Sequence, residues 1–95
     1  MKIFIHMSIH FPKEGKEKYL IDSMHRFGDA MKERKGLIMA YTTKDEDTDR
    51  LIGLAIWESK DDWLAARPAM VAAVKDDPFE EWELKEPDVF HLNAI

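Results

Sequence analysis

Apolar and polar side chains alternate at the start of the chain, between residues 2 and 11. Odd-numbered positions hold isoleucine, methionine or phenylalanine, and even-numbered ones hold lysine, phenylalanine, serine and two histidines. A period of two residues predicts a β-strand with an aliphatic face and a mixed face. Pro12 ends this strand, because it lacks the N–H that a sheet ladder needs.

The next segment changes to a helical period. Its apolar side chains follow one another at spacings of four, three and four and form one stripe: Leu20, Met24, Phe27 and Met31. The stripe predicts a helix from residue 15 to about Arg34. Gly36 stands where a left-handed residue is expected to close such a helix.

Two apolar segments follow, at residues 37–43 and 50–58, separated by an acidic turn at 45–49. Their lengths and the short turn predict two strands that form a hairpin. Both faces of both strands are largely apolar, whereas a sheet with one face in water alternates more cleanly. We therefore expect each side of the sheet to be covered.

The remaining residues predict two helices and a last strand. Ser59, followed three residues later by Asp62, has the spacing of a helix cap. Pro68 predicts a kink or a restart in that helix. Asp77 precedes a proline and is expected to cap a short second helix. Residues 88–95 form the last predicted strand.

The order of these elements is strand, helix, strand, strand, helices, strand. This split βαββαβ order is typical of a ferredoxin-like α+β fold, in which an antiparallel sheet carries its helices on one face. No repeat or linker divides the chain, so residues 1–95 are expected to form one domain. Because the helices cover one face only, a second copy of the chain is the simplest cover for the other.

Composition narrows the classes of partner. Lys and Arg number 14 against 19 Asp and Glu, which gives a net charge of −5 with no basic run, so no nucleic-acid partner is expected. The chain has no cysteine and no apolar stretch of the roughly 20 residues that a membrane helix needs. With no targeting segment recognised, we expect a cytoplasmic protein without a membrane partner. The charged runs 44–49 and 75–86 are expected to be solvated.

Four short segments add information beyond the order of elements. They are residues 3–5, residues 12–16 before the first helix, residues 35–37 after it, and above all residues 54–60, Leu-Ala-Ile-Trp-Glu-Ser-Lys. Together they resemble the antibiotic biosynthesis monooxygenase (ABM) domain family, over nearly the whole chain. The resemblance implies a ferredoxin-like homodimer whose two sheets pack as a dimeric α+β barrel.

The functions of this family are diverse, so the fold alone does not choose among them. Some members oxidise polyketide phenols to quinones with O₂ and without metal or flavin. Others degrade haem, and others act on quinols or signalling molecules. The resemblance implies, as a first hypothesis, a monooxygenase that needs no cofactor and acts on a small aromatic molecule.

Trp57 shares a strand face with Gly53 and Ala55. If this face meets the helices, as the resemblance implies, the two small residues leave space for a flat ligand beside the indole. The alternative is that Trp57 only packs in the core. Tyr41 on the neighbouring strand could donate a hydrogen bond into such a pocket or simply pack, and Phe27 is placed at the same surface.

The second long helix carries Trp63 and Arg67 on one predicted face. Several ABM oxygenases have an aromatic residue at the position of Trp63, although a tryptophan there also suits core packing. A guanidinium on an apolar stripe must reach water, a carboxylate or a ligand oxygen. Arg67 is therefore predicted, with Trp57, as a catalytic residue that stabilises an anionic intermediate; the alternative is an arginine that extends to solvent.

Further polar candidates lie on the first and last strands: His6, His10, His91 and Asn93. If the aliphatic sides of these strands face the helices, these four side chains point to the other side, into the dimer barrel. One histidine could then act as a general base, although hydrogen bonding at the interface is the simpler explanation. No metal site is assigned, because histidines four apart on a strand lie about 13 Å apart and only His6 and His91 could meet.

Haem degradation is disfavoured by comparison with that branch of the family. Its tryptophan matches Trp57, but its first-strand asparagine corresponds to Met7 or Ser8, and its axial histidine corresponds to Arg67. The quinone-forming branch matches at both tryptophans but has an asparagine where this chain has Gly53. Two alternatives to an enzyme stay open, namely a homodimer that binds a hydrophobic metabolite without turnover and a structural homodimer with no pocket.

Overall fold

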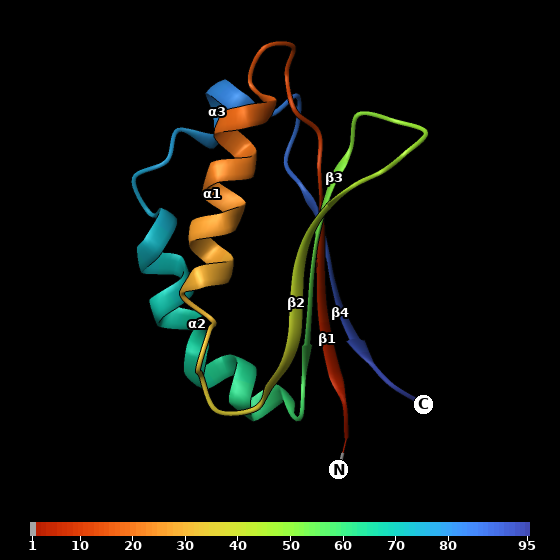
Figure 1. Cartoon of the computed structure of the whole chain (residues 1–95), viewed down its shortest axis with the longest axis vertical. Coiled ribbons are helices and arrows are strands. Elements are labelled where there is room, and N and C mark those ends of the chain that lie inside the picture. The colour runs from red at the N-terminus through yellow and green to blue at the C-terminus, as the bar shows by residue number, and fades with distance from the viewer. Residues whose placement is uncertain (1) are drawn as a thin grey trace.

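The computed structural model describes residues 2–95 as a layer of helices on one face of an antiparallel sheet (Figure 1). The elements are β1 Phe4–His10, α1 Glu17–Asp29, β2 Leu37–Lys44, β3 Leu51–Trp57, α2 Lys60–Val74, α3 Phe79–Trp82 and β4 Asp88–Asn93. The strands lie in the order β2-β3-β1-β4, and every pair is antiparallel. This is the predicted ferredoxin-like α+β fold, with the first and last strands as neighbours.

Helix α1 is shorter than predicted. It ends at Asp29 rather than near Arg34, because the chain continues in tight turns in which Met31 and Arg34 each donate a backbone bond to the carbonyl three residues earlier. Glu33 and Gly36 then have positive φ angles of 65° and 89°. Gly36 is left-handed as expected, but it closes these turns and not the helix itself.

Two expectations about the later helices are also corrected. α2 begins at the predicted Ser59 cap, whose hydroxyl accepts a backbone N–H of the first turn, and it runs from Lys60 to Val74 without the restart at Pro68 that was one of the two expected outcomes. α3 has no side-chain cap. Asp77 instead accepts hydrogen bonds from Ser23 and Arg26 of α1, so it ties the segment after α2 to α1.

The histidines of β1 face the helices, which reverses the predicted direction. Phe4 pairs with Trp57 across the sheet, and both side chains are almost completely buried. Because alternate residues of a strand share a face, the even-numbered positions of β1 follow Phe4 toward the helices. His6 accordingly stacks on Trp63 of α2, with ring centroids 5.3 Å apart. The glycine and alanine of β3 leave room for these polar rings.

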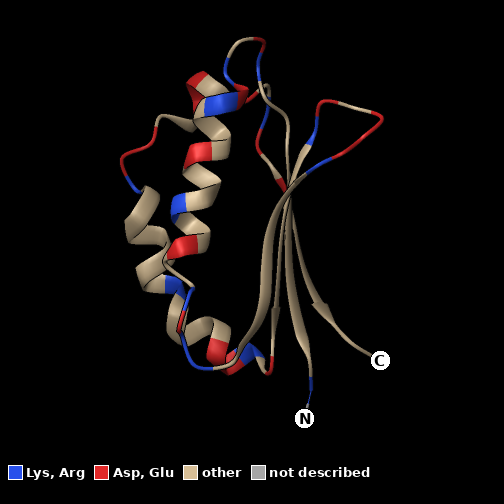
Figure 2. Ribbon diagram, in the orientation of Figure 1, with Lys and Arg blue, Asp and Glu red and all other residues tan. Residues whose placement is uncertain are grey.

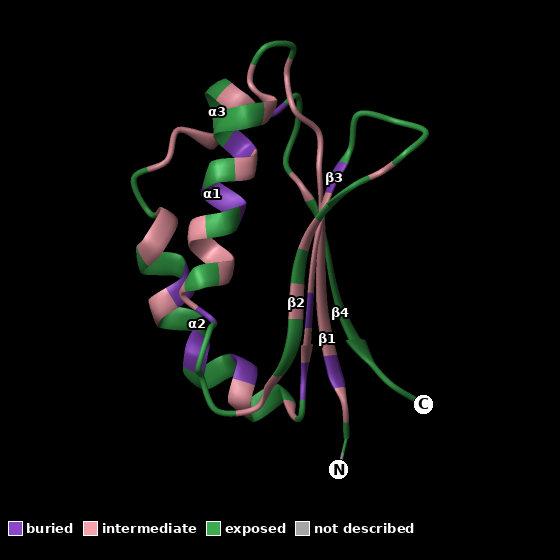
Figure 3. Ribbon diagram, in the orientation of Figure 1, coloured by how far each residue is buried: buried purple, intermediate pink, exposed green. Residues whose placement is uncertain are grey.

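Two buried clusters join the helices to this face of the sheet (Figure 3). The larger cluster contains Phe4, Met31, Ala55, Trp57, Trp63, Ala66 and Met70, and the smaller contains Leu20, Met24 and Leu51. The predicted apolar stripe of α1 is therefore confirmed as its inward face. On α2 the buried positions include Ala66, whereas Arg67 is exposed.

The other face of the sheet is apolar and uncovered. Figure 2 shows that charged residues are concentrated on the helices and loops, while the strands carry few charges along most of their length. The exposed fractions of its large side chains are 41% for Met39, 57% for Tyr41, 38% for Phe90 and 40% for Leu92. Among residues 2–95, no helix has the length and apolar character required to cross a bilayer.

Candidate active site

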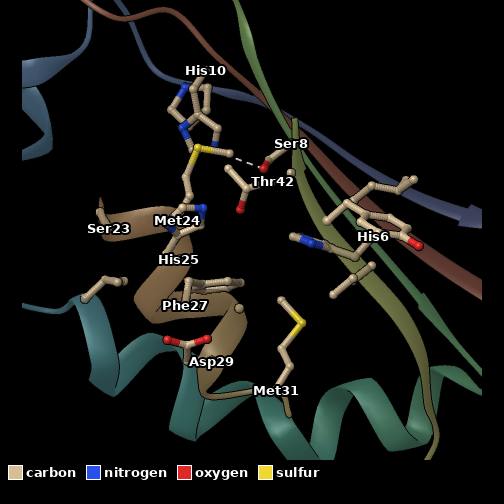
Figure 4. Close-up of a pocket in the computed structure, with 18 of the residues that line it drawn as sticks. His6, Ser8, His10, Ser23, Met24, His25, Phe27, Asp29, Met31 and Thr42 are labelled. Atoms are coloured by element: carbon tan, nitrogen blue, oxygen red, sulfur yellow. Dashed lines mark hydrogen bonds between the residues drawn. The ribbon is translucent and has the colours of Figure 1, made fainter. Parts of the chain in front are cut away.

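A cavity of about 550 Å³ lies between α1 and the sheet (Figure 4). Its walls are mostly apolar and include Met24, Phe27 and Met31 from α1 and Ala40 and Ala55 from the sheet. Polar side chains of β1 and β2 border the same space, namely His6, Ser8, His10 and Thr42. This size and this distribution of polar groups are typical of a site for a small organic molecule.

Gly53 keeps the middle of the sheet face open. It pairs with Ser8 of β1 and Thr42 of β2, so it lies between two hydroxyl-bearing residues on the cavity floor. A Cβ atom at this position would lie 3.0 Å from Ser8 Oγ and 3.4 Å from Met24 Cε. Any larger side chain at Gly53 would therefore displace the cavity walls or fill the cavity.

A chain of hydrogen bonds connects Ser8 on this floor to Glu83, which follows α3. Ser8 Oγ lies 3.0 Å from His10 Nε2, and His10 Nδ1 lies 3.1 Å from Glu83 Oε1. The backbone N–H of Phe11 also donates to Glu83 Oε1, at 3.3 Å. Glu83 is only 6% exposed, so burial and these two donors fix its carboxylate beside the imidazole.

The direction of these bonds follows from the carboxylate. An ionised carboxylate only accepts hydrogen bonds, so His10 carries its proton on Nδ1 and donates it to Glu83. In the neutral imidazole Nε2 is then an acceptor, and the Ser8 hydroxyl donates to it. The lone pairs of Ser8 Oγ are left available to a ligand in the cavity, which Ser8 borders in Figure 4.

A second cavity of about 300 Å³ adjoins the first and shares His6, Phe27 and Val89 with it. Trp63 and Arg67 of α2 and His91 of β4 complete much of its wall, together with Met70 and Val71. No acidic side chain borders it among the described residues. The second cavity therefore offers a cationic end to a ligand that occupies the first.

His6, Trp63 and His91 pack as a group of three rings between the cavities. His6 and His91 are direct cross-strand partners with ring centroids 5.4 Å apart, and His91 lies 4.9 Å from Trp63. Burial is the main cause that lowers the pKa of His6 to about 4, and the nearby His91, Arg67 and His10 act in the same direction. His6 is therefore neutral near pH 7.

The structure brings some of the predicted site residues together and separates others. Phe27, Gly53 and Ala55 line the larger cavity, as the flat-ligand hypothesis requires. Trp57 is completely buried and borders neither cavity; it lies on the same face of the sheet as Ala55 and packs in the larger buried cluster, as the core-packing alternative requires. Tyr41 touches the edge of the larger cavity, but its position opposite Leu54 puts its side chain on the outer face of the sheet.

The remaining polar candidates also differ in position. His6 and His10 line the larger cavity, and Arg67 and His91 line the smaller one. Asn93 is exposed at the pair with Phe4 and lies outside both cavities. In residues 2–95 no group of three or more histidine and acidic side chains is arranged to hold a metal ion.

Glu83 is the functional candidate that sequence patterns missed. It lies in the charged run 75–86, for which the sequence predicts solvation, yet it is buried and bonded to His10. The other charged residues of the run are exposed apart from the partly buried Asp77, so composition gave no reason to single out Glu83. The one signal lies in β1. If Phe4 is taken as an inward residue, His10 also points inward, and a buried imidazole needs a hydrogen-bond partner from another segment.

No protein-family profile matches this sequence, and no curated protein is detectably related to it. Solved structures, however, share the fold at TM-scores near 0.8. Rv0793 from Mycobacterium tuberculosis superimposes with a TM-score of 0.83 and 12% identity, over 98% of this chain and 95% of that one. A protein from Nitrosomonas europaea, provisionally named an antibiotic biosynthesis monooxygenase, gives 0.82 and 9% identity over 98% and 90%.

A third structure has the same provisional name and comes from Chloroflexus aurantiacus. It superimposes with a TM-score of 0.73 and 11% identity, over 98% of this chain and 93% of that one. The fold is therefore that of ABM-type proteins, as the sequence resemblance implied. At such low identity the likeness extends to the fold and not to substrate or catalytic residues.

Proposed function

We propose that the protein is a monooxygenase that needs no cofactor and inserts one oxygen atom into a small phenol or quinol, to give a quinone from the phenol or a hydroxyquinone from the quinol. The observation that carries this proposal is the apolar cavity of about 550 Å³ with basic side chains on its sheet floor. A flat aromatic ring suits its walls of methionine, phenylalanine and alanine. The ABM-type fold supports the same class of reaction, since two of its structural neighbours are provisionally named as such monooxygenases.

The reaction of a phenol with one O₂ gives a quinone and one water. Removal of the hydroxyl proton makes the ring electron-rich, and the phenolate passes one electron to O₂. The resulting superoxide bonds to the para carbon of the ring, and protonation gives a hydroperoxide. Loss of the proton from that carbon forms the second carbonyl while the O–O bond breaks, and the departing hydroxide takes a proton to become water.

The protein needs three properties for this reaction, namely a bound ring, a base and a stabilised anion. Phe27 and Met24 enclose the ring from the helix side, and Gly53 and Ala55 leave space beneath it. A floor histidine accepts the hydroxyl proton. The guanidinium of Arg67, at the adjoining smaller cavity, favours the anionic form of the ligand.

The proposal includes a homodimer in the cytoplasm, without a nucleic-acid or membrane partner. The uncovered apolar face of the sheet supports the homodimer, because soluble monomers rarely expose a large contiguous apolar surface. The net charge of −5 disfavours a phosphate backbone.

The test is oxygen uptake by purified, chelator-treated protein in the presence of 1-naphthol or anthrone, each of which must gain an oxygen atom to become a quinone. We expect one O₂ consumed for each quinone formed, with the product identified by absorbance and mass. Gly53→Leu should abolish uptake because the side chain fills the cavity. Arg67→Gln should lower kcat about 10-fold through loss of anion stabilisation. Ile52→Leu, at the next position on the opposite face, is the control and should keep full activity.

Two results would contradict the proposal. If ligands bind saturably but no oxygen is consumed, the protein is the non-catalytic binding homodimer. If Gly53→Leu folds and behaves as the unchanged protein in both binding and uptake, the cavity is not the site.

A further inference from the structure

Glu83 is buried where a carboxylate has little electrostatic reason to be. Glu83 is the first residue after α3, yet its carboxylate lies against the end of β1. There it accepts hydrogen bonds from His10 and from the backbone N–H of Phe11. No lysine or arginine pairs with it among the described residues. Burial of a charge without a full counter-ion is costly, so a structural role alone leaves this arrangement poorly explained.

His10 and Ser8 connect the Glu83 carboxylate to the larger cavity. His10 is 14% exposed at its side chain, and Ser8 stands between it and the open floor above Gly53. A carboxylate on Nδ1 and a hydroxyl on Nε2 form a linear path for one proton, from the cavity to the imidazole. The carboxylate then stabilises the imidazolium that the transfer creates.

We propose that Ser8, His10 and Glu83 form a proton relay that ionises a phenolic ligand bound in the larger cavity. The ligand class rests on the proposed function, but the relay itself concerns ionisation and not oxidation. It gives His10 the role of base, Ser8 the role of the group that touches the ligand, and Glu83 the role of a positioning residue.

The transfer moves one proton at each step and changes no oxidation state. The ligand O–H bond breaks as its proton passes to Ser8 Oγ, and the original Ser8 proton passes to His10 Nε2. The products are a phenolate hydrogen-bonded to a neutral Ser8, and an imidazolium held by the Glu83 carboxylate. No co-reactant is needed.

The other histidines near the cavities are less suited to this role. His6 faces Arg67 and His91, and these cationic or protonatable neighbours disfavour its charged form, as does its burial. His25 borders the cavity from α1, but it is exposed and makes no hydrogen bond among the described contacts. Only His10 combines a cavity position with a carboxylate partner in the described chain.

The test uses 7-hydroxycoumarin, a phenol whose two ionisation states differ in absorbance. The bound dye is titrated with pH at saturating protein, and its apparent pKa is compared with that of the free dye. We expect binding to lower this pKa by at least about one unit, which is a 10-fold change in the ionisation equilibrium. Glu83→Gln, which keeps the acceptor but removes the charge, should erase most of the relay's contribution to the shift, and His10→Asn should leave only the part that Arg67 contributes.

Matched variants keep the result interpretable. His25→Asn changes an exposed histidine that borders the same cavity, and it should leave the shift intact. Ser8→Ala removes the middle hydroxyl with little risk to folding and should reduce the shift. Circular dichroism of each variant shows whether it is folded.

Several outcomes would overturn the relay. Dye that binds without a pKa change, or with the same change in folded Glu83→Gln and His10→Asn, excludes it. If neither 7-hydroxycoumarin nor 1-naphthol binds, the cavity does not take a phenol ligand, and both proposals are excluded. A relay-dependent shift without oxygen uptake keeps the relay and excludes the monooxygenase.

Discussion

His6 and His10 stand on the same face of β1 and differ in their neighbours. His10 has the Glu83 carboxylate on one nitrogen and the Ser8 hydroxyl on the other. His6 stacks on Trp63 and faces only neutral or cationic groups. Two histidines on one strand thus have different surroundings: His10 has a carboxylate partner, whereas burial and its neighbours keep His6 neutral.

The neutral state of His6 makes stability depend on pH. The pKa of its side chain falls from 6.5 to about 4 on folding, mainly because of burial. A lowered histidine pKa means that the unfolded chain binds more protons between these values, so folding weakens as pH falls through this window. Allowing for partial exposure of the ring, we expect a loss of about 1 kcal/mol between pH 7 and pH 5.

Urea unfolding at the two pH values measures this effect. His6→Gln should lose about 1 kcal/mol less than the unchanged protein over the same interval. His25→Gln, which alters an exposed histidine, serves as the control and should follow the unchanged protein. An identical pH dependence for His6→Gln would show that His6 is not held neutral by the fold.

Residues of this kind can be identified from the sequence, but their environments cannot. The pattern of β1 singles out the histidines and leaves His6 and His91 as the one pair that could meet, and these two are cross-strand partners. It predicts their direction wrongly, because both faces of the strand carry apolar side chains and the more aliphatic face is expected to form the core. Phe4 is the larger anchor, and its contact with Trp63 decides which face meets the helices.

At the scale of elements, Asp77 fastens α1 to the end of α2. Ser23 donates to Asp77 Oδ2 at 2.6 Å, and Arg26 donates to the same oxygen at 2.9 Å and to the Ala73 carbonyl at 3.0 Å. Burial alone would raise the pKa of Asp77, but the bonds from Ser23 and Arg26 outweigh it and lower that pKa. The carboxylate therefore stays ionised in a largely enclosed position.

Asp77→Ala should destabilise the protein by about 2 kcal/mol, because the buried Ser23 hydroxyl loses its acceptor. Asp22→Ala is the matched control, since Asp22 also binds Arg26 but is 70% exposed. We expect that control to cost about 0.5 kcal/mol or less in urea unfolding. Equal losses for the two variants would show that Asp77 acts only as a surface ion pair.

Alanine substitutions at Gly36 and Gly28 are expected to change stability in opposite directions. Gly36 has a φ angle of 89°, and the side chain of Asp62 occupies the place where a Cβ would stand. Gly36→Ala should therefore cost about 2 kcal/mol through backbone strain and a displaced helix cap. Gly28 lies in α1, where an added Cβ would meet no atom within 4 Å, so Gly28→Ala should stabilise the protein by about 0.5–1 kcal/mol. Thermal unfolding distinguishes the two, and a stabilised Gly36→Ala would refute the strain.

Most elements were predictable because their signals are local. The strands differ from their predicted bounds by at most two residues, and the Ser59 cap is where its spacing placed it. The exceptions involve tertiary contacts. Asp77 has the local sequence pattern of a helix cap, but its carboxylate binds Ser23 and Arg26 of α1 instead of the backbone of α3. Similarly, α1 stops early because the chain must turn back into β2.

The whole molecule exposes the sheet face opposite its helices. We expect this face to bind a second copy, so the protein should sediment as a dimer. Phe90→Glu should give a folded monomer, because it places a charge at the 38%-exposed Phe90 of that face. Leu64→Glu changes an even more exposed apolar residue on α2, at 47%, and should leave the dimer intact. Analytical ultracentrifugation decides, and a monomeric unchanged protein would contradict the prediction.

The fold was predictable at this scale, whereas the site was predictable only in part. Periodicity and turn signals give the order and the two apolar faces of the sheet, and these suffice for the architecture. The space above the sheet depends on the missing side chain at Gly53, and the hydrogen bonds from Ser8 through His10 depend on the arrival of Glu83 from a distant part of the chain. The strand pattern already indicated the space at Gly53 and Ala55, but the position of Glu83 is not visible in a local pattern, because it depends on how separated segments meet.

The cavity between α1 and the sheet is tested most directly by NMR titration of ¹⁵N-labelled protein with 1-naphthol. Binding there should shift the backbone amide signals of Ser8, His10, Gly28, Thr42 and Gly53, all of which border the cavity. Amides at the exposed outer face, such as those of Met39 and Phe90, should stay in place. Saturable shifts at the first group support the site, whereas no shifts, or shifts confined to the outer face, would contradict it.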